Sequence, residues 1–147
     1  MYDNWVSEIE SDVFTYLEYL LTSKGTSPFP ELTCSTSSQN DNVEGVATFP
    51  TLYVHVLPPV EEGNDLDNEI IGAVRVTVEL QVFSNIDEKE CRNIMDACIK
   101  IMKHLRFNIG LFPDPQKSNK TYFAVARFSR VLAKGELDYL IAQDIEF

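Results

Sequence analysis

Residues 74–82 read VRVTVELQV, and this stretch decides the fold of the chain. Valine or leucine stands at every even position, and a polar or charged residue stands at every odd position between them. Strict alternation of this kind predicts a β-strand that buries one face and leaves the other face polar, as antiparallel sheets do. The residues expected to face the core are Val74, Val76, Val78, Leu80 and Val82.

The segment before this strand predicts a second one. Apolar and polar residues alternate from Phe49 to Leu57, with Leu52, Val54 and Val56 on one side. Pro58-Pro59 ends the strand, because proline has no N–H to donate to a ladder. We therefore expect the two strands to form a hairpin whose long, acidic tip runs from Glu61 to Glu69.

The segment after the central strand predicts a helix that opens at Asp87. The Asp87 carboxylate is expected to accept a hydrogen bond from the Glu90 backbone, while the Glu90 side chain reaches back, as in a capping box. The expected buried stripe, spaced three and four residues apart, consists of Cys91, Ile94, Met95, Cys98, Ile101, Met102 and Leu105. The chain is then expected to turn between Arg106 and Phe112, with Gly110 as the break.

A third strand is predicted from Tyr122 to Leu132, after a polar loop from Pro113 to Lys120. Both faces of this strand carry apolar side chains, and Arg127 and Arg130 fall on opposite faces. The pattern indicates either a central strand or a strand with one face covered by a neighbouring subunit.

The two ends of the chain differ in character. Residues 5–23 predict an amphipathic helix, capped by Asp3 or Asn4 and stopped by Gly25. Its expected core stripe is Val6, Ile9, Val13, Tyr16, Leu17, Leu20 and Leu21. The polar stretch at 25–48 predicts a long loop, which has room for one short strand near residues 43–47. Residues 135–147 are too apolar for a free tail, and predict either a short helix docked on the same domain or an arm that packs on another subunit.

Together these elements predict one α+β domain over residues 1–147. We expect a small mixed or antiparallel sheet of about three to five strands, with two main helices packed on one face. The hydrophobic fraction of 44% is ordinary for a globular protein, and the length allows a real core.

The chain is strongly acidic, with 23 acidic and 12 basic residues and a formal net charge of −11. This charge argues against a surface that grips nucleic acid, because such binding depends on Lys and Arg at the phosphates. It is compatible with a protein that surrounds DNA without holding it, since an acidic wall repels the phosphate backbone. Simple solubility explains the charge as well.

No residue pattern in the chain predicts catalysis, a metal site or a cofactor. Cys34, Cys91 and Cys98 have no CxxC spacing and are expected to be small core residues in a reducing compartment. His55 and His104 lack metal-ligand spacing. The acidic N-terminal region is unlike a signal peptide, and no apolar run approaches the roughly 20 residues of a membrane span.

Several segments together resemble a known family. They are Phe49-Pro50 at a strand start, the ladder from Arg75 to Ser84, the helix from Asp87, Leu105-Arg106-Phe107, and Tyr122 with Ala126-Arg127-Phe128-Ser129. This order resembles the small tail terminator (tail completion) proteins of long-tailed bacteriophages, especially those that infect Gram-positive hosts. The resemblance runs from the first helix to Val131. The chain departs from the family in its longer segment at 25–48 and in Arg106, which stands where related proteins tend to carry glycine.

The resemblance implies a structural role and no enzymatic activity. Tail terminators form hexameric rings that cap the growing tail tube, stop its polymerisation and present a surface to the head or neck. The implied partners are other copies of the chain, the major tail tube protein and a head-completion or neck protein. DNA would pass through the ring without specific binding, and the protein would reside in the virion after assembly in the host bacterial cytoplasm, without contact with a membrane.

Ten residues are the candidate contacts of such a ring. Two loops are expected to reach partners along the tail axis, while sheet edges or the C-terminal segment join subunits. The candidates are Glu61, Glu62, Asp65 and Asp67 in the hairpin tip, Pro113, Lys117 and Lys120 in the polar loop, Arg127 in the third strand, and Tyr139 and Phe147 near the C-terminus.

Three alternatives remain open on sequence grounds. The first is another neck component of related fold, such as a head-closure or minor tail protein. The second is a small hydrolase or nuclease that uses loop carboxylates such as Asp65 and Asp67. The third is a monomeric cytosolic regulator that binds a host protein through its acidic surface.

Overall fold

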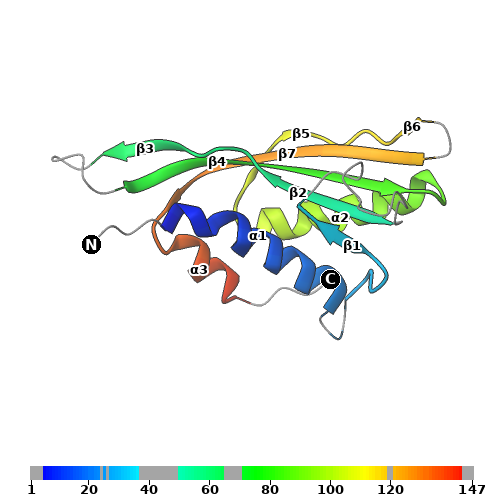
Figure 1. Ribbon diagram of the computed structural model, residues 1–147, viewed down its shortest axis with the longest axis horizontal. Helices are drawn as coiled ribbons and strands as arrows, with labels where there is room; N and C mark the ends of the chain where they lie inside the picture. Colours follow the sequence, from blue (N-terminus) through cyan, green and yellow to red (C-terminus); the bar gives the residue numbers. More distant parts are fainter. Residues whose placement is uncertain are drawn as a thin grey trace.

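The computed structural model describes residues 5–23, 25, 27–36, 50–64, 71–118 and 121–143, and places helices against one face of a single sheet (Figure 1). The first helix, predicted at 5–23, consists of a 3-10 turn η1 (Trp5–Glu8), α1 (Ile9–Glu18) and a π turn η2 (Tyr19–Ser23). The other helices are α2 (Glu88–His104) and the short α3 (Glu136–Ile141).

The sheet is mixed and has β4 at its centre. Its path runs β1-β2-β4-β7-β5, while β3 also pairs with β4 and β6 with β7. Among the strands that the structure describes, only β1 and β2 run parallel to each other. The strands are β1 (Thr33–Ser35), β2 (Thr51–Val56), β3 (Val60–Asn64), β4 (Ile71–Ser84), β5 (Asn108–Leu111), β6 (Gln116–Ser118) and β7 (Thr121–Ala133). The predicted α+β class, with two main helices packed on the sheet, is confirmed.

The alternation that predicted the central strand is confirmed in β4. Its five expected core residues are buried, and they point toward the helices. β4 pairs with β7 from Ala73 opposite Ala133 to Ser84 opposite Tyr122. β7 therefore lies inside the sheet, between β4 and the short strands β5 and β6, as one reading of its sequence predicted.

The structure corrects the predicted hairpin, because an additional strand, β3, lies between β2 and β4 in the sequence. The stretch from Glu61 to Asn64 belongs to this strand and not to a loop, and β3 pairs with the start of β4. β2 pairs further along the same strand, so β2 and β3 follow one another along one side of β4 with Pro58-Pro59 between them. The prolines interrupt the ladder without redirecting the chain. The rest of the predicted tip, residues 65–69, lies outside the described residues.

Two further predictions about loops were wrong. Asn108 to Leu111 forms the edge strand β5 where a turn was expected, and Gly110 lies at a register shift in its pairing with β7. Such a bulge adds a residue to one strand but lets the strand continue in the same direction, whereas a turn would reverse the chain. The short strands β1 and β6 also lie within predicted loops, because strands of three residues carry too little alternation to be recognised. Phe49 and the strand expected near residues 43–47 lie outside the described residues.

The core lies between the sheet and the helices. The predicted stripe of α2 is buried from Cys91 to Leu105, and the predicted α1 stripe is buried except for the partly covered Val6. Cys91 and Cys98 belong to this core as small apolar residues, as predicted.

The N-terminus of α2 is capped by one half of the predicted capping box. Asp87 Oδ1 accepts a hydrogen bond from the Glu90 backbone N–H at 2.7 Å. The Glu90 carboxylate accepts instead from Ser84 Oγ at 2.6 Å, and Ser84 Oγ accepts from the Ile86 N–H. The serine at the end of β4 is buried, so the Glu90 side chain satisfies a core hydroxyl and ties the helix start to the strand end.

The C-terminus of α2 closes in a Schellman motif at a non-glycine residue. The Arg106 N–H donates to Lys103 O at 2.9 Å, and the Phe107 N–H donates to Met102 O at 3.0 Å. Arg106 adopts φ 64°, the left-handed conformation that this motif requires. Phe107 and Met102 are both buried, which supplies the apolar contact that accompanies the motif. An arginine, and not the glycine that this conformation favours, therefore occupies the strained position.

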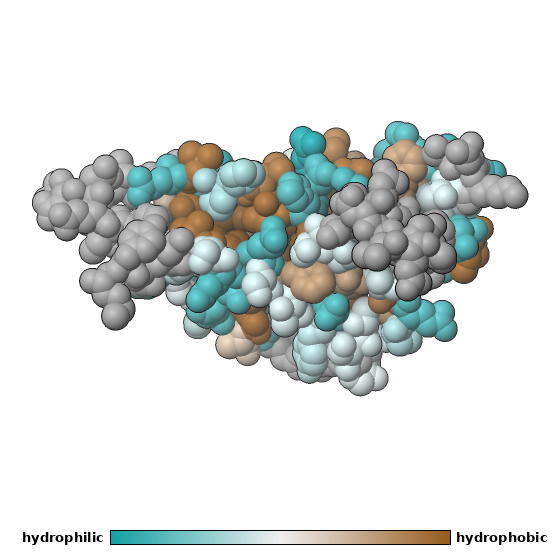
Figure 2. All heavy atoms as spheres, viewed as in Figure 1, coloured by the Kyte–Doolittle hydropathy of each residue, from teal (hydrophilic) through white to brown (hydrophobic). Residues whose placement is uncertain are grey.

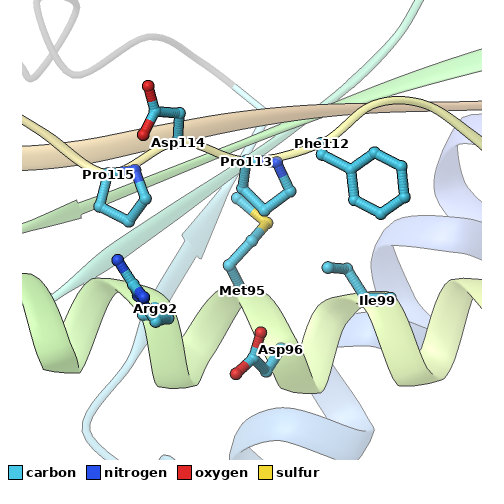
Figure 3. A pocket seen from close by; sticks show the side chains of 8 residues that line it. All are labelled: Arg92, Met95, Asp96, Ile99, Phe112, Pro113, Asp114 and Pro115. Carbon is cyan, nitrogen blue, oxygen red and sulfur yellow. The ribbon is translucent and has the colours of Figure 1, made fainter.

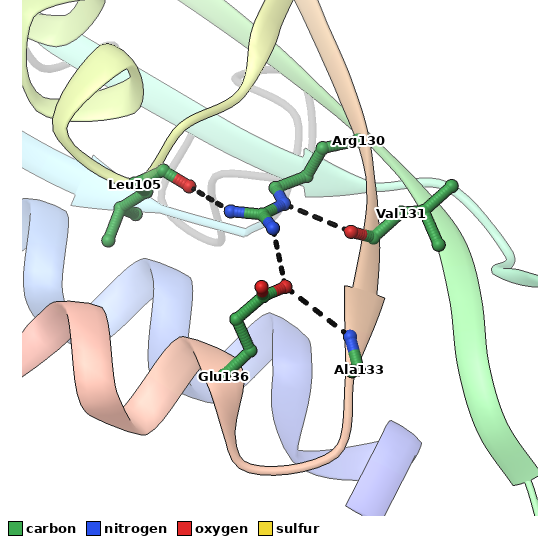
Figure 4. Close-up of polar contacts among 5 residues, drawn as sticks. All are labelled: Leu105, Arg130, Val131, Ala133 and Glu136. Carbon is green, nitrogen blue, oxygen red and sulfur yellow. Dashed lines mark hydrogen bonds and ion pairs between the residues drawn. The ribbon is translucent and has the colours of Figure 1, made fainter.

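α3 is held against the sheet by Arg130, whose side chain is only 12% exposed (Figure 4). Its Nη1 donates to Leu105 O, a carbonyl freed at the end of α2, at 2.8 Å. Nη2 forms an ion pair with Glu136 of α3, and Nε donates to Val131 O at 3.1 Å. Leu137 and Leu140 complete the docking in the core. Of the two alternatives for 135–147, the described part is a helix packed on its own chain, and residues 144–147 lie outside it.

We predict that Arg106→Gly raises the free energy of unfolding by about 0.5–1 kcal/mol. A left-handed L-residue costs about 1–2 kcal/mol, and the extra freedom of glycine in the unfolded chain offsets part of the gain. Urea unfolding monitored by circular dichroism measures the change. The matched control is Arg106→Ala, which removes the same side chain but keeps the Cβ. Equal stability of the two variants would show that the backbone is not strained there.

We predict that Arg130→Met lowers the free energy of unfolding by about 2 kcal/mol, because it removes charge-assisted bonds from a buried position. Arg127→Met is the control on the same strand, since Arg127 itself is 54% exposed and Gln81 still donates to Glu79 in that variant, so the expected loss is only about 1 kcal/mol. Hydrogen exchange on α3 should rise only in the Arg130 variant. Protection of α3 that is unchanged by Arg130→Met would contradict the proposed clamp.

Candidate interaction surfaces

The first candidate surface is the sheet face that no described helix covers, which we call the outer face. In Figure 1 the helices lie on one side of the sheet, and the other side of β4 and β7 carries none. Opposite residues of antiparallel strands share a face, so the outer face contains the odd-numbered residues of β4 and β7. Figure 2 shows apolar residues gathered along the strands, interspersed with hydrophilic ones.

One end of the outer face is aromatic. The rings of Tyr53 and Phe83 meet edge to face with centroids 5.4 Å apart, and Phe83 stacks near Phe123 at 6.2 Å. These residues come from β2, β4 and β7, so the cluster joins three neighbouring strands. Cross-strand aromatic pairs of this kind stabilise a sheet face beyond the area they bury.

The middle of the outer face is charged. Arg127 Nε donates to Glu79 Oε2 at 2.7 Å, and Gln81 Nε2 donates to Glu79 Oε1 at 2.6 Å. Partial burial raises the pKa of Glu79, but the hydrogen bonds from Gln81 and Arg127 outweigh this effect and hold the pKa below its usual range. Glu79 is therefore ionised at neutral pH. An open groove of about 390 Å³ beside this pair is lined by Thr77, Gly110, Leu111, Arg127, Phe128 and Ser129.

A second groove lies between α2 and the segment that joins β5 to β6 (Figure 3). Phe112, Pro113 and Pro115 lie above the helix residues Met95 and Ile99. Arg92, Asp96 and Asp114 supply the charged rim of this groove, which has a volume of about 380 Å³. Arg92 also pairs with Glu88 one turn earlier at 2.6 Å.

A third groove, of about 300 Å³, runs between α1 and α3. Its walls are Asp12, Thr15, Tyr16, Tyr19, Asp138 and Ile141. Burial, together with the negative charges of Asp138 and Glu8, raises the pKa of Asp12. The acids of this groove thus repel one another, and residues 5–23 contain no lysine or arginine to neutralise them.

The ten candidate contact residues do not form one site. Glu61 and Glu62 lie in β3, Pro113 lines the α2 groove, and Tyr139 is exposed on α3. Lys117 of β6 lies over the Tyr122 ring at 5.4 Å, and Arg127 is on the outer face. Asp65, Asp67, Lys120 and Phe147 lie outside the described residues.

The sequence did not predict which charged side chains meet on these surfaces. Glu79 was assigned only to the polar side of a strand, although its position opposite Arg127 depends on the register between β4 and β7. The acidic α1–α3 groove joins residues 126 positions apart in the chain, Asp12 and Asp138. Charge alternation along a strand signals exposure, but it carries no information about the partner strand or its register.

The described residues offer little reactive chemistry. Among them, no three histidine, cysteine, aspartate or glutamate residues gather closely enough to hold a metal ion. His104 Nε2 lies 3.1 Å from Leu140 O, and His55 is exposed at the end of β2. No helix in the described ranges is long and apolar enough to cross a bilayer.

The three cysteine thiols are held neutral. Burial, with a smaller contribution from Glu18, raises the pKa of Cys34 to about 12. Burial, with smaller contributions from the negative charges of Glu90 and Glu88, raises the pKa of Cys91 to about 11. Burial also raises the pKa of Cys98. Because the thiolate is the nucleophile, none of them is activated.

No protein-family model matches the chain, and no curated protein matches it at a significant level of similarity.

We predict that the thiols of the native protein react slowly with a disulfide reagent at pH 8. After unfolding in guanidinium, all three thiols should react rapidly. The unfolded thiols ionise near pH 9, whereas the folded ones retain their protons to higher pH. The folded state thus binds more protons above pH 9, so its stability should fall as the pH rises through that range. Rapid labelling of Cys91 or Cys98 in the native protein at pH 8 would contradict this assignment.

Proposed function

We propose that this chain is a structural assembly protein, whose surfaces serve contacts with other protein subunits. More specifically, we propose that it is a tail terminator of a long-tailed bacteriophage. Six copies would form a closed ring at the head-proximal end of the tail, end polymerisation of the tail tube and offer a surface for head or neck joining. DNA would pass through the ring without being held.

The observation that carries this proposal is the order and layering of the elements. The resemblance rests on an order of elements that the chain has: a first helix, the strands β2 and β4, the capped helix α2 and the strand β7. The helices of the described ranges cover one sheet face and not the other, so these residues form a packed core together with a broad surface for neighbours.

The projecting end of β3 and β4 supplies a second argument. At the left of Figure 1 these two strands extend past the start of α1, where Asn64 of β3 pairs with Ile71 of β4. A hairpin that projects beyond the helices is suited to reach an axial neighbour such as the tube protein or a neck protein. The net charge of −11 is suited to a channel wall that DNA slides past, because the wall repels the phosphates.

The direct test is tube assembly. Purified chain added to polymerising tail tube protein of the same virus should yield short tubes with a ring at one end in electron micrographs, and a virus lacking the gene should make overlong tails without heads. Tubes of unaltered length that carry no ring, together with normal tails in the mutant virus, would overturn the proposal.

We predict that the hairpin tip is needed for axial contacts. Because Glu61 lies in β3, deletion of 61–69 would remove a strand, so the sharper variant replaces only residues 65–70 with a glycine-serine turn. This variant should keep its circular dichroism spectrum and lose tube capping or head joining. Replacement of Asn93, which is exposed on α2, with serine is the control. Normal tail length and normal joining in the tip variant would contradict the role of the tip.

A further inference from the structure

The α2 groove, between α2 and the segment that joins β5 to β6, combines an apolar floor with an exposed aromatic wall (Figure 3). Its helix wall consists of Arg92, Met95, Asp96 and Ile99, which are spaced three and four residues apart and therefore share one side of α2. Phe112 forms part of the opposite wall and is 71% exposed, the highest value among the large apolar side chains of the described residues. An aromatic ring left in solvent beside a concave surface is a typical anchor for another protein.

Two prolines make the wall opposite α2 rigid. Pro113 and Pro115 fix their own φ angles and have no N–H to offer to a neighbouring strand. Among the described strands, β5 and β6 on either side of this segment pair only with β7. The prolines therefore oppose the addition of a further strand at this part of the sheet edge. The region presents side chains to a partner, and its fixed shape lowers the entropic cost of binding.

The rim of the α2 groove is acidic. Arg92 is the one cation among its eight lining residues, and it is already paired with Glu88 at 2.6 Å. Asp96 and Asp114 lie on opposite walls (Figure 3), and neither takes part in an ion pair within the described ranges. The rim thus carries two unmatched negative charges on either side of an apolar floor.

The lining of the groove defines the chemistry of its occupant. An apolar side chain is suited to the space beside Phe112 and Ile99, and basic residues next to it can reach Asp96 and Asp114 at the rim. The stem of a lysine or the plane of an arginine can also lie on the Phe112 ring, which adds a cation–π contact. The volume of about 380 Å³ is at the small end of binding sites, so the groove suits a short segment.

The net charge of the chain selects the class of partner. Nucleic acids and anionic lipid surfaces are repelled by the acidic rim and by the net charge of −11. A second copy carries the same net charge of −11, so its approach is opposed at long range. A basic segment of a different protein is attracted by the whole molecule and by the rim together.

We propose that the α2 groove binds a short segment of a different protein, in which an apolar side chain is flanked by lysine or arginine. The apolar side chain packs on Phe112 and Ile99, and the flanking cations pair with Asp96 and Asp114. This contact goes beyond the proposed ring, because it follows from the lining of the groove and does not depend on the symmetry or the place of an assembly.

A peptide titration tests the contact. The probe is the peptide GKKLFKKG, which is added to the isotopically labelled full chain and followed by NMR chemical shifts. The largest shifts should occur at Ile99, Phe112 and Asp114. The peptides GEELFEEG, with anions in place of the cations, and GKKSSKKG, without the apolar pair, should bind at least about fivefold more weakly. Equal binding of the three peptides, or shifts centred on the α1–α3 groove, would overturn the proposal.

Substitutions at exposed positions provide an independent measurement. Phe112→Ser and Asp114→Lys should each weaken the binding of GKKLFKKG at least about fivefold, because they remove the aromatic wall and reverse one rim charge. The matched controls are Tyr139→Ser and Glu10→Lys, which make the same kinds of change at exposed positions of α3 and α1 and should leave binding unchanged. Controls that lose binding as strongly as the groove variants would contradict the proposed site.

Sedimentation velocity distinguishes this partner from a second copy. The proposal expects Phe112→Ser to leave the oligomeric state of the chain unchanged. Self-association of the unsubstituted chain that disappears in this variant would assign the groove to a second copy and overturn the proposal.

The proposed function and this contact fail separately. A chain that caps tail tubes but binds GKKLFKKG no better than GEELFEEG retains the function and loses the contact. A chain that binds GKKLFKKG in the α2 groove but never alters tube length retains the contact and loses the function.

Discussion

The antiparallel pairing of β4 with β7 is the constraint on which the other features of the structure depend. The two strands stay in register from Ala73 opposite Ala133 to Ser84 opposite Tyr122. Because side chains alternate along each strand, this one register sends Val76, Val78 and Phe128 into the core and Glu79 and Arg127 to the outer face together. A shift of one residue would bury the charges and expose the valines, so core packing and surface chemistry are selected by the same pairing.

The end of α2 is the second point where several elements meet. Its last turn closes through Arg106 in the left-handed conformation, and the freed carbonyl of Leu105 accepts a bond from Arg130. The same guanidinium holds Glu136, so one cation joins α2, β7 and α3. A buried arginine can do this because its planar group has five donors and remains charged. Helix termination and docking of the C-terminal helix are thus coupled in one small region.

The charges left at the surface after folding are unevenly distributed. On the outer face the strands β4 and β7 contribute Arg75, Glu79 and Arg127, and Arg127 is paired with Glu79. The α1–α3 groove instead gathers Asp12 and Asp138, whose mutual repulsion adds to burial in raising the pKa of Asp12. The sheet face that no described helix covers is the feature that connects the fold to the proposed assembly role.

The sequence by itself determined the strands and helices that alternate or repeat over many residues. β4, α1 and α2 follow from hydrophobic period, as does the burial of Cys91 and Cys98, and β7 follows from its aromatic and β-branched residues. Tertiary structure alone decided the pairing of β3 and β2 along one side of β4, the short strands β1, β5 and β6, and the docking of α3. The physical reason is that the residues of a long segment reveal its buried face through their own spacing. A short strand, or a contact such as that of Arg130 with Leu105, is stable only through partners distant in the chain.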